Sequence, residues 1–162
     1  MIYEFRFHAD IFRYAIWLIK DKSIAEDVVQ ETFLRAWKSL DNLQDDNAAK
    51  AWLITIFRRA NARRFERKQF DLVDIDDHHI ADTKPSVEMD ADQYLLHRLI
   101  MKLAPEYREP LILQVMAGFN GDEIAGILNL NRNTVMTRLF RARNQLKEQL
   151  EKKTTQKGNH HG

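Results

Sequence analysis

The sequence predicts an all-α protein built from two small helical blocks. Apolar residues recur at three- and four-residue spacings in most of the chain, whereas the apolar–polar alternation of half-buried strands is almost absent. The five glycines gather late in the sequence. Between the helical blocks lies a stretch rich in aspartate and without clear periodicity, which has the composition of a linker.

The boundaries of these blocks follow from the same pattern. We expect a first helical domain at residues 1–69, a flexible acidic linker at 70–92, a second domain at 93–151 and a disordered tail at 152–162. A chain of 162 residues can hold two domains of this size, each marginal as an independent unit. Because the linker lacks apolar anchors, we expect the two domains to move relative to each other.

Composition excludes several classes of protein. The chain has no cysteine, which rules out disulfides and thiolate metal sites and fits a reducing compartment. The start does not resemble a signal peptide, and the apolar run Tyr14–Ile19 is too short to cross a bilayer. We therefore expect a soluble intracellular protein without direct membrane insertion.

Histidines provide the one argument for a metal-dependent enzyme. The pairs His78–His79 and His160–His161 lie in segments expected to be disordered, and adjacent histidines point apart on a helix. No glutamate is placed beside them as a general base. His8 and His97 are isolated and expected to be structural. We therefore expect no metal, no cofactor, no small-molecule substrate and no enzymatic activity.

The first block contains three helices. The first covers about residues 9–19, with Phe12, Ile16 and Ile19 on one face. The second opens with a capping box, in which Ser23 and Glu26 would satisfy each other's free backbone donors. Its predicted inward face comprises Val29, Phe33, Ala36 and Leu40.

A second face of that helix carries a mostly charged stripe. Its residues share one side at helical spacing: Asp27, Gln30, Glu31, Leu34 and Lys38. Such a stripe is usually solvated surface, although the leucine in its middle suggests a docking site.

The third helix of the block would be capped by Asp46 or Asn47 and run to Lys68. Its second half, residues 58–68, is densely basic and contains the aromatic Phe65. Basic residues interleaved with aromatic ones can hold phosphates and stack unpaired bases. The alternative is a cationic helix that pairs with the acidic linker. Both are compatible if the linker screens the helix until DNA displaces it.

Residues 122–147 of the second block have the pattern of a helix-turn-helix. Asn129 stands where the turn requires a left-handed conformation, and Asn131 is a good N-cap for the second helix. Apolar faces are formed by Ile124, Ala125 and Leu128 on the first helix and by Val135, Leu139, Ala142 and Leu146 on the second.

From Arg132 to Lys147 every charged residue is basic, as expected of a helix that binds a polyanion. Arginine and asparagine can read guanine and adenine edges through paired hydrogen bonds. The predicted DNA-facing side chains are Arg132, Asn133, Thr134, Thr137, Arg138 and Arg141. The alternative is a solvated basic helix that packs on a neighbour.

Ahead of this motif, Pro105 suits the first turn of another helix. The residues expected to complete the core of the second block are Tyr107, Leu111, Leu113, Val115 and Met116.

Taken in order, these motifs resemble the extracytoplasmic-function sigma factors of bacteria, a group of the sigma-70 family. The resemblance rests on the segments Ser23–Trp37, Ala51–Leu53, Leu103–Glu109, Glu123–Ala125 and Thr134–Arg143. It extends over about residues 12–150, with the linker unmatched. Such proteins are promoter-specificity subunits of RNA polymerase and have no catalytic activity of their own.

The resemblance implies a role for each surface. The side chains that match the helix docking on core RNA polymerase are Asp27, Gln30, Glu31, Leu34, Arg35 and Lys38. The part that melts the −10 element and captures a flipped base corresponds to the loop 41–47 and the basic helix, with Leu43, Arg58, Arg59, Asn61, Arg63, Arg64 and Arg67 as candidate contacts. The second block matches the domain that reads the −35 element as duplex.

The chain departs from the family pattern at three places. Arg59 stands where members usually carry Asn, and Asn61 is the nearest amide. Phe119–Gly121 replaces the usual Leu-Ser-Tyr, and Asn129 replaces the usual glycine of the turn, both of which keep a plausible turn. The segment ahead of the first helix is also shorter than is typical of the family.

The resemblance further implies a bacterial cytoplasmic location and control by an anti-sigma factor that clamps both blocks. The rival interpretation is a stand-alone helix-turn-helix regulator that binds duplex DNA as a dimer. That interpretation gives no role to the stripe on the second helix.

Overall fold

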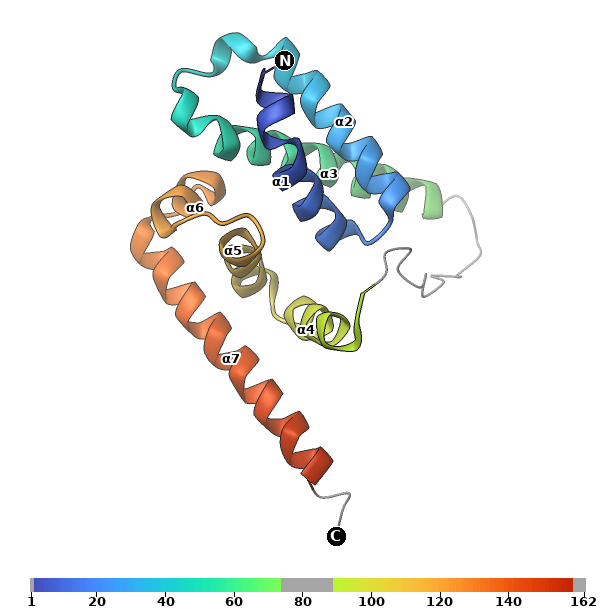
Figure 1. Ribbon diagram of the computed structural model, residues 1–162, viewed down its shortest axis with the longest axis vertical. Helices are drawn as coiled ribbons and strands as arrows, with labels where there is room; N and C mark the ends of the chain where they lie inside the picture. Colours follow the sequence, from blue (N-terminus) through green and yellow to red (C-terminus); the bar gives the residue numbers. More distant parts are fainter. Residues whose placement is uncertain (1, 74–88, 159–162) are drawn as a thin grey trace. The chain divides into compact units, whose positions relative to one another are not determined.

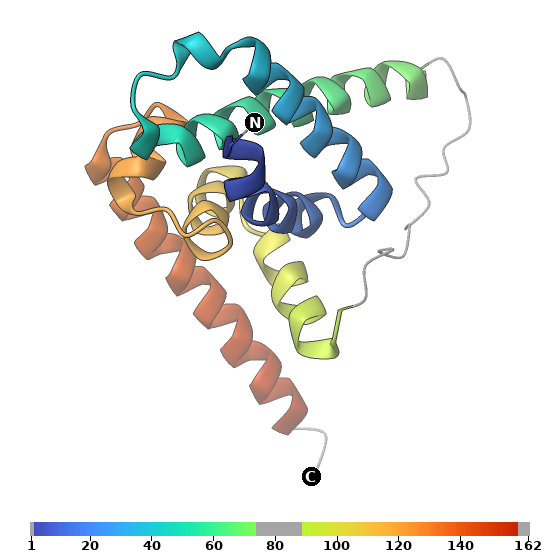
Figure 2. The same ribbon diagram turned by 45° about the horizontal axis from the view of Figure 1, so that its top comes forward.

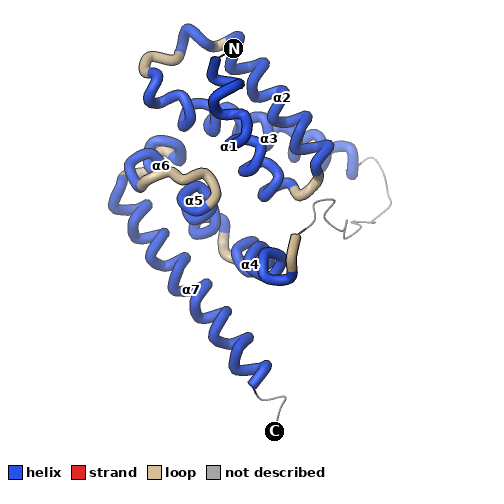
Figure 3. Tube along the Cα trace, viewed as in Figure 1, coloured by secondary structure: helices blue, strands red, loops and turns tan. Residues whose placement is uncertain are grey.

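The computed structural model describes residues 2–73 and 89–158, and all regular structure within these ranges is helical (Figure 3). The all-α fold class is therefore confirmed. The chain divides into two compact units, unit 1 (Met1–Glu88) and unit 2 (Met89–Gly162). Of the linker predicted at 70–92, residues 74–88 lie outside the described ranges.

Unit 1 is formed by three helices, α1 (Ile2–Ile19), α2 (Lys22–Lys38) and α3 (Ala49–Val73), which all pack against one another (Figures 1 and 2). Two short 3-10 helices, η1 (Leu40–Asn42) and η2 (Asp46–Ala48), lie between α2 and α3. The largest fully buried side chains of this unit include Ile11, Tyr14, Val29, Leu53, Ile54 and Phe57.

Unit 1 differs from the sequence predictions at the helix starts. The predicted Ser23–Glu26 capping box is wrong, because α2 begins earlier and Asp21 is its N-cap, accepting a hydrogen bond from the Ile24 amide at 3.1 Å. Asp45 likewise accepts from the Asn47 amide at the start of η2. Neither Asp46 nor Asn47 therefore caps α3, since both lie inside this 3-10 turn.

Unit 2 contains α4 (Ala91–Met101), α5 (Pro105–Val115), α6 (Gly121–Leu128) and α7 (Arg132–Gly158). Helices α4, α5 and α6 each pack against α7, and the long α7 continues past α5 and α6 (Figures 1 and 2). Pro105 occupies the first turn of α5, as predicted. Leu99, Leu113, Ile124 and Leu139 are among the fully buried side chains that join the four helices.

Helices extend into the segments predicted as linker and tail. Helix α3 extends to Val73, and α4 begins at Ala91 behind a capping box formed by Asp90 and Gln93. Residues 152–158, predicted to be disordered, are the last turns of α7, whereas 159–162 lie outside the described residues. Polar composition does not stop a helix that is already anchored, because each added residue gains one backbone hydrogen bond.

Two residues predicted to be core are exposed. Leu40 follows the end of α2 and lies in η1, so the helical spacing that placed it inward no longer applies. Val115 is 57% exposed because it lies two residues, or about 200°, around α5 from the buried Leu113. Tyr107 and Met116 are half-buried, whereas Leu111 and Leu113 are buried as predicted.

Candidate nucleic-acid interface

The predicted helix-turn-helix is formed by α6 and α7. Asn129 adopts the left-handed conformation, with φ 55° and ψ 47°, as the sequence predicted. The amide of Leu130 then donates to the Ala125 carbonyl at 2.9 Å, which closes the end of α6. The side chain of Asn131 accepts a hydrogen bond from the Thr134 amide at 2.8 Å, so the predicted N-cap of α7 is confirmed.

The start of α6 is also closed by its own side chains. Asn120 accepts from the Glu123 amide at 2.9 Å, and Glu123 accepts from the Asn120 amide at 3.1 Å. This reciprocal pair is a capping box. The substitution of the usual family residues at 119–121 therefore retains a well-formed start for this helix.

The core face of α7 determines which of its residues reach the surface. Val135, Leu139 and Ala142 are fully buried, as the spacing predicted. Four of the predicted DNA-facing residues are exposed, namely Arg132, Asn133, Thr137 and Arg141, while Thr134 and Arg138 are half-buried. Helix α7 thus presents polar and cationic side chains in the region that a helix-turn-helix places in the major groove.

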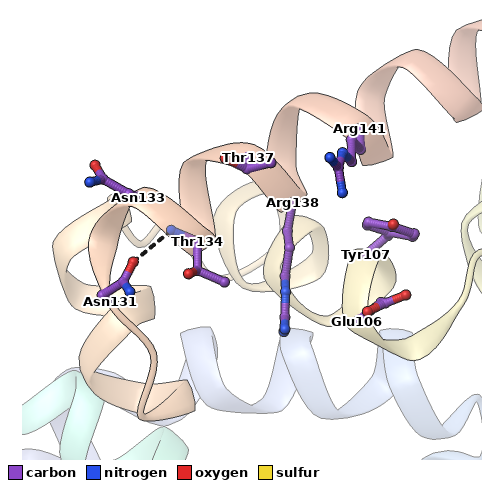
Figure 4. A pocket seen from close by; sticks show the side chains of 8 residues that line it. All are labelled: Glu106, Tyr107, Asn131, Asn133, Thr134, Thr137, Arg138 and Arg141. Atoms are coloured by element: carbon purple, nitrogen blue, oxygen red, sulfur yellow. Dashed lines mark hydrogen bonds between the residues drawn. The ribbon is translucent and has the colours of Figure 1, made fainter.

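A pocket joins this face of α7 to the start of α5. It is lined by Asn131 and five of the predicted residues of α7, together with Glu106 and Tyr107 of α5 (Figure 4). The guanidinium groups of Arg138 and Arg141 lie on the side of α7 that faces these two residues (Figure 4). Sequence reasoning missed Glu106 and assigned Tyr107 to the core, because nothing local links them to α7.

Arg132, the remaining predicted residue, does not line the pocket. Its Nε lies 3.5 Å from the Asp122 carboxylate on α6, and both side chains are largely exposed. An exposed ion pair of this kind contributes little to stability.

The basic part of α3 does not form one uniform cationic face. Arg59 and Arg67 are exposed, whereas Arg58, Asn61, Arg63 and Arg64 are half-buried. Arg64 donates to Asn61 Oδ1 at 3.3–3.4 Å and lies 4.6 Å from the ring centre of Phe65. Burial lowers the pKa of the Arg64 guanidinium, and the negative charge of Asp21 partly offsets this. Arg63 Nε is buried without a hydrogen-bond partner.

The loop ahead of α3 carries the remaining candidate, Leu43, which is half-buried between η1 and η2. Asp46, in η2, accepts a hydrogen bond from the Tyr3 hydroxyl of α1. Close to the same loop, Lys50 Nζ lies 3.8 Å from the Asp10 carboxylate. Sequence reasoning missed these two contacts of α1, because each joins residues far apart in the chain.

The stripe on α2 lies on the surface of unit 1. Of the six side chains expected to dock on core polymerase, five are exposed, namely Asp27, Gln30, Leu34, Arg35 and Lys38, and Glu31 is half-buried. Within it, Arg35 Nε donates to Glu31 Oε1 at 3.0 Å. The exposed fraction is 58% for Leu34 and 63% for the nearby Trp37, which sequence reasoning did not include. Leu34 and Trp37 therefore add exposed apolar surface to an otherwise polar side of α2.

Histidines show no metal-binding arrangement in the described ranges. Within residues 2–73 and 89–158, no three His, Cys, Asp or Glu side chains lie together as potential ligands. His8 stacks against Phe12 and Phe33, with ring centres 5.9 and 5.8 Å apart, and His97 is buried. The two histidine pairs lie outside the described residues.

Among the described helices, none is long and apolar enough to cross a membrane.

Fold and surfaces together define a two-unit, all-helical protein whose second unit carries a helix-turn-helix with a cationic second helix. A family model described as Sigma-70 region 2 matches residues 6–70, and one described as Sigma-70, region 4 matches residues 93–146. The first match falls within unit 1 and the second within unit 2.

Similar proteins agree with these matches. The ECF RNA polymerase sigma factor SigM of Bacillus subtilis is 32% identical over 143 residues, which cover 85% of this chain and 86% of SigM. RNA polymerase sigma factor SigV of the same organism is 32% identical over 88% of this chain and 86% of its own length. The sigma factor RpoE from Bartonella quintana, solved in complex with the anti-sigma factor NepR, has a TM-score of 0.71 and 28% identity, covering 91% of this chain and 96% of RpoE.

The chain belongs to the extracytoplasmic-function group of the sigma-70 family. It is an alternative sigma factor, which binds core RNA polymerase and directs promoter-specific transcription initiation.

Proposed function

We propose that the two units divide promoter recognition between them, with unit 1 docking on core RNA polymerase and opening the −10 element while unit 2 reads the −35 duplex. The observation that carries this proposal is the match of region 2 to unit 1 and of region 4 to unit 2, in that order along one chain. A stand-alone regulator would have no use for the region 2 unit.

In this proposal α7 enters the major groove of the −35 element. Its contacts are Arg132, Asn133, Thr134, Thr137, Arg138 and Arg141. The confirmed cap at Asn131 and the buried face of α7 support this arrangement, because they hold the first turns of the helix in place.

In unit 1, the exposed stripe of α2 is the docking surface for core polymerase. Leu34 and Trp37 supply exposed apolar area, and the surrounding charged side chains supply specificity. The −10 contacts lie in the loop before α3 and on α3, at Leu43, Arg58, Arg59, Asn61, Arg63, Arg64 and Arg67. Since Arg64 already donates to Asn61 Oδ1, a flipped base that needs this oxygen as an acceptor would have to share it with Arg64.

We also propose an anti-sigma factor as a partner. Two structurally similar sigma factors were solved in complex with a partner, RpoE with the anti-sigma factor NepR and CnrH with the cytosolic domain of CnrY. The CnrH structure has a TM-score of 0.68 and 25% identity, covering 91% of this chain and 84% of CnrH. The protein would act as a non-catalytic subunit, without a cofactor or small-molecule substrate, in the bacterial cytoplasm where core polymerase transcribes.

Run-off transcription with purified core polymerase tests the proposal. The first template is the region upstream of the protein's own gene. If that region yields no transcript, the template is a set of duplexes that the holoenzyme selects from a random library. A discrete transcript that depends on this protein is expected. Tight duplex binding by the protein alone, with no binding to core polymerase, would instead establish the stand-alone regulator.

Paired variants test the surfaces. Arg138→Ala is expected to weaken binding to the −35 duplex by about 1–3 kcal/mol if it reads a base. Arg143→Ala is the matched control, because it removes the same charge from α7 where the side chain bonds Gln114. Equal losses for the two variants would contradict a base-reading role for Arg138.

Docking on core polymerase is tested by Gln30→Ala with Leu34→Ala, which is expected to abolish core binding and leave the fold intact. Gln156→Ala with Leu150→Ala is the matched control, since both residues are exposed on α7 and lie beyond the region 4 match. Unfolding of the first double variant would contradict the docking assignment.

A further inference from the structure

The segment between α2 and α3 is held in place by few packing contacts. None of the residues of η1 or η2 is buried. Its backbone hydrogen bonds are short-range, such as the Leu43 amide to the Leu40 carbonyl at 3.1 Å and the Ala48 amide to the Asp45 carbonyl at 3.0 Å. Local bonds of this kind shape each turn but do not orient the segment relative to the helices.

Helix α1 supplies side-chain contacts on this segment from outside. The Tyr3 hydroxyl, on the first turn of α1, donates to the Asp46 carboxylate of η2 across 43 positions in the chain. Two turns further along α1, Asp10 lies 3.8 Å from Lys50 at the start of α3. The hydrogen bond with Asp46, together with desolvation, raises the pKa of the Tyr3 hydroxyl, as expected for a hydroxyl that donates to a carboxylate.

The segment between α2 and α3 is acidic, so the positions of its carboxylates matter for DNA binding. Asp41, Asp45 and Asp46 place three carboxylates in a loop that the proposed function brings to DNA. Carboxylates repel DNA phosphates, and the strength of this repulsion depends on how close the carboxylate lies to the DNA. The Asp45 carboxylate accepts a hydrogen bond from the Asn47 amide, and the Asp46 carboxylate accepts one from the Tyr3 hydroxyl.

We propose that Tyr3 is a positioning residue for −10 recognition, which acts through Asp46 to hold the segment Leu40–Ala48 in the conformation that receives the melted strand. This inference rests on the proposed role of that segment. Tyr3 itself contacts no DNA in this arrangement, and the Asp10–Lys50 pair supports the same segment at its end.

The experiment uses holoenzyme reconstituted from the full chain and core polymerase. The probe is a duplex selected from a random library by the wild-type holoenzyme, and permanganate reactivity of thymines measures the opened fraction. The variants are Tyr3→Phe, Asp46→Ala, their combination, and Asp46→Asn, whose amide oxygen can still accept the bond. Tyr94→Phe is the control, because it removes a hydroxyl from α4 of unit 2.

Tyr3→Phe is expected to lower the opening equilibrium about 2- to 10-fold, the range for loss of one hydrogen bond. The double variant is expected to open as Asp46→Ala alone does, because Tyr3 has no acceptor left once this carboxylate is removed. Asp46→Asn is expected to open at least as well as the wild type, since it keeps an acceptor and removes a charge that repels phosphate, and Tyr94→Phe is expected to open as the wild type does. Core binding is expected to stay unchanged, and thermal stability is expected to fall by no more than the loss of one exposed hydrogen bond, whereas a general loss of folding would also remove core binding.

Three results would overturn the inference: normal opening by Tyr3→Phe, additive losses in the double variant, or an equal loss of core binding. Failure of the wild-type holoenzyme to open any selected duplex would instead contradict the proposed function. The two failures are therefore distinguishable.

Discussion

Replacing Asn131 with alanine removes the side-chain cap from the first turn of α7. The bond that is lost, from the Thr134 amide to Asn131 Oδ1, measures 2.8 Å. Loss of such a cap costs about 1 kcal/mol, within a range of about 0.5–2. For a unit of this size, that corresponds to a fall in Tm of about 4–8 °C.

Two further substitutions separate helix capping from DNA binding. Asn131→Ser keeps a capping oxygen and is expected to stay within about 0.5 kcal/mol of the wild type. Asn131→Asp also keeps the cap, and its charge favours the helix N-terminus by about 0.3–1 kcal/mol. The same charge repels DNA phosphates, so we expect Asn131→Asp to gain stability and lose duplex affinity, whereas Asn131→Ala loses both.

The tryptophans provide an internal reference for the measurement. Trp17, Trp37 and Trp52 are the three tryptophans of the chain, and all belong to unit 1. Denaturation followed by tryptophan emission therefore reports on unit 1 and is expected not to change. Far-UV circular dichroism reports on both units and is expected to show the shift, while anisotropy of a labelled −35 duplex reports binding.

Two outcomes would refute the reasoning. If Asn131→Asp destabilised the protein as much as Asn131→Ala, the side-chain oxygen would not be acting as a cap. If Asn131→Ala lost stability but bound the duplex normally, the first turn of α7 would not contact DNA.

Three other predictions concern separate parts of the chain. Asn129→Ala is expected to lower the free energy of unfolding by about 1 kcal/mol in urea denaturation, because φ is 55° at this position. Asn129→Gly is expected to be neutral or stabilising, since glycine adopts this conformation readily. Equal losses for the two variants would contradict the role of the left-handed backbone. Glu31→Ala is expected to change stability by no more than about 0.5 kcal/mol, because the ion pair of Glu31 with Arg35 is partly exposed. The same variant is expected to weaken binding to core polymerase in a pull-down. Unchanged core binding would remove Glu31 from the docking surface. The pKa of Tyr3 is raised, so its hydrogen bond with Asp46 is fully present below the ordinary tyrosine pKa of about 10 and is lost as the pH rises through the higher pKa of the folded state. The difference in 295 nm absorbance between the wild type and Tyr3→Phe is therefore expected to titrate above the ordinary tyrosine pKa. A difference that titrates at or below the ordinary pKa would contradict the bond.

Several features of the helix-turn-helix could be predicted from neighbouring residues. The left-handed Asn129, the cap at Asn131 and the buried stripe of Val135, Leu139 and Ala142 all agree with the structure. Each depends on interactions within about one turn or on the repeat of the α-helix, so the information lies in a short window of sequence.

Predictions failed where two local solutions compete. Ser23 and Asp21 can both begin α2, and Asp45 competes with Asp46 and Asn47 before α3. The choice depends on where the preceding helix ends and how the chain turns, which spacing does not specify. The end of α7 was missed for a related reason, because composition does not reveal how far an anchored helix continues.

The sequence by itself determined the helical class, the order of the two units and the cationic character of α7, since these follow from periodicity and from residue types that are close in the chain. Only the tertiary structure decided that Glu106 and Tyr107 join the pocket of α7, that Tyr3 bonds Asp46, and that Trp37 is exposed beside Leu34. These features depend on packing between helices, where contacts join residues far apart and the surrounding side chains determine which ones remain at the surface.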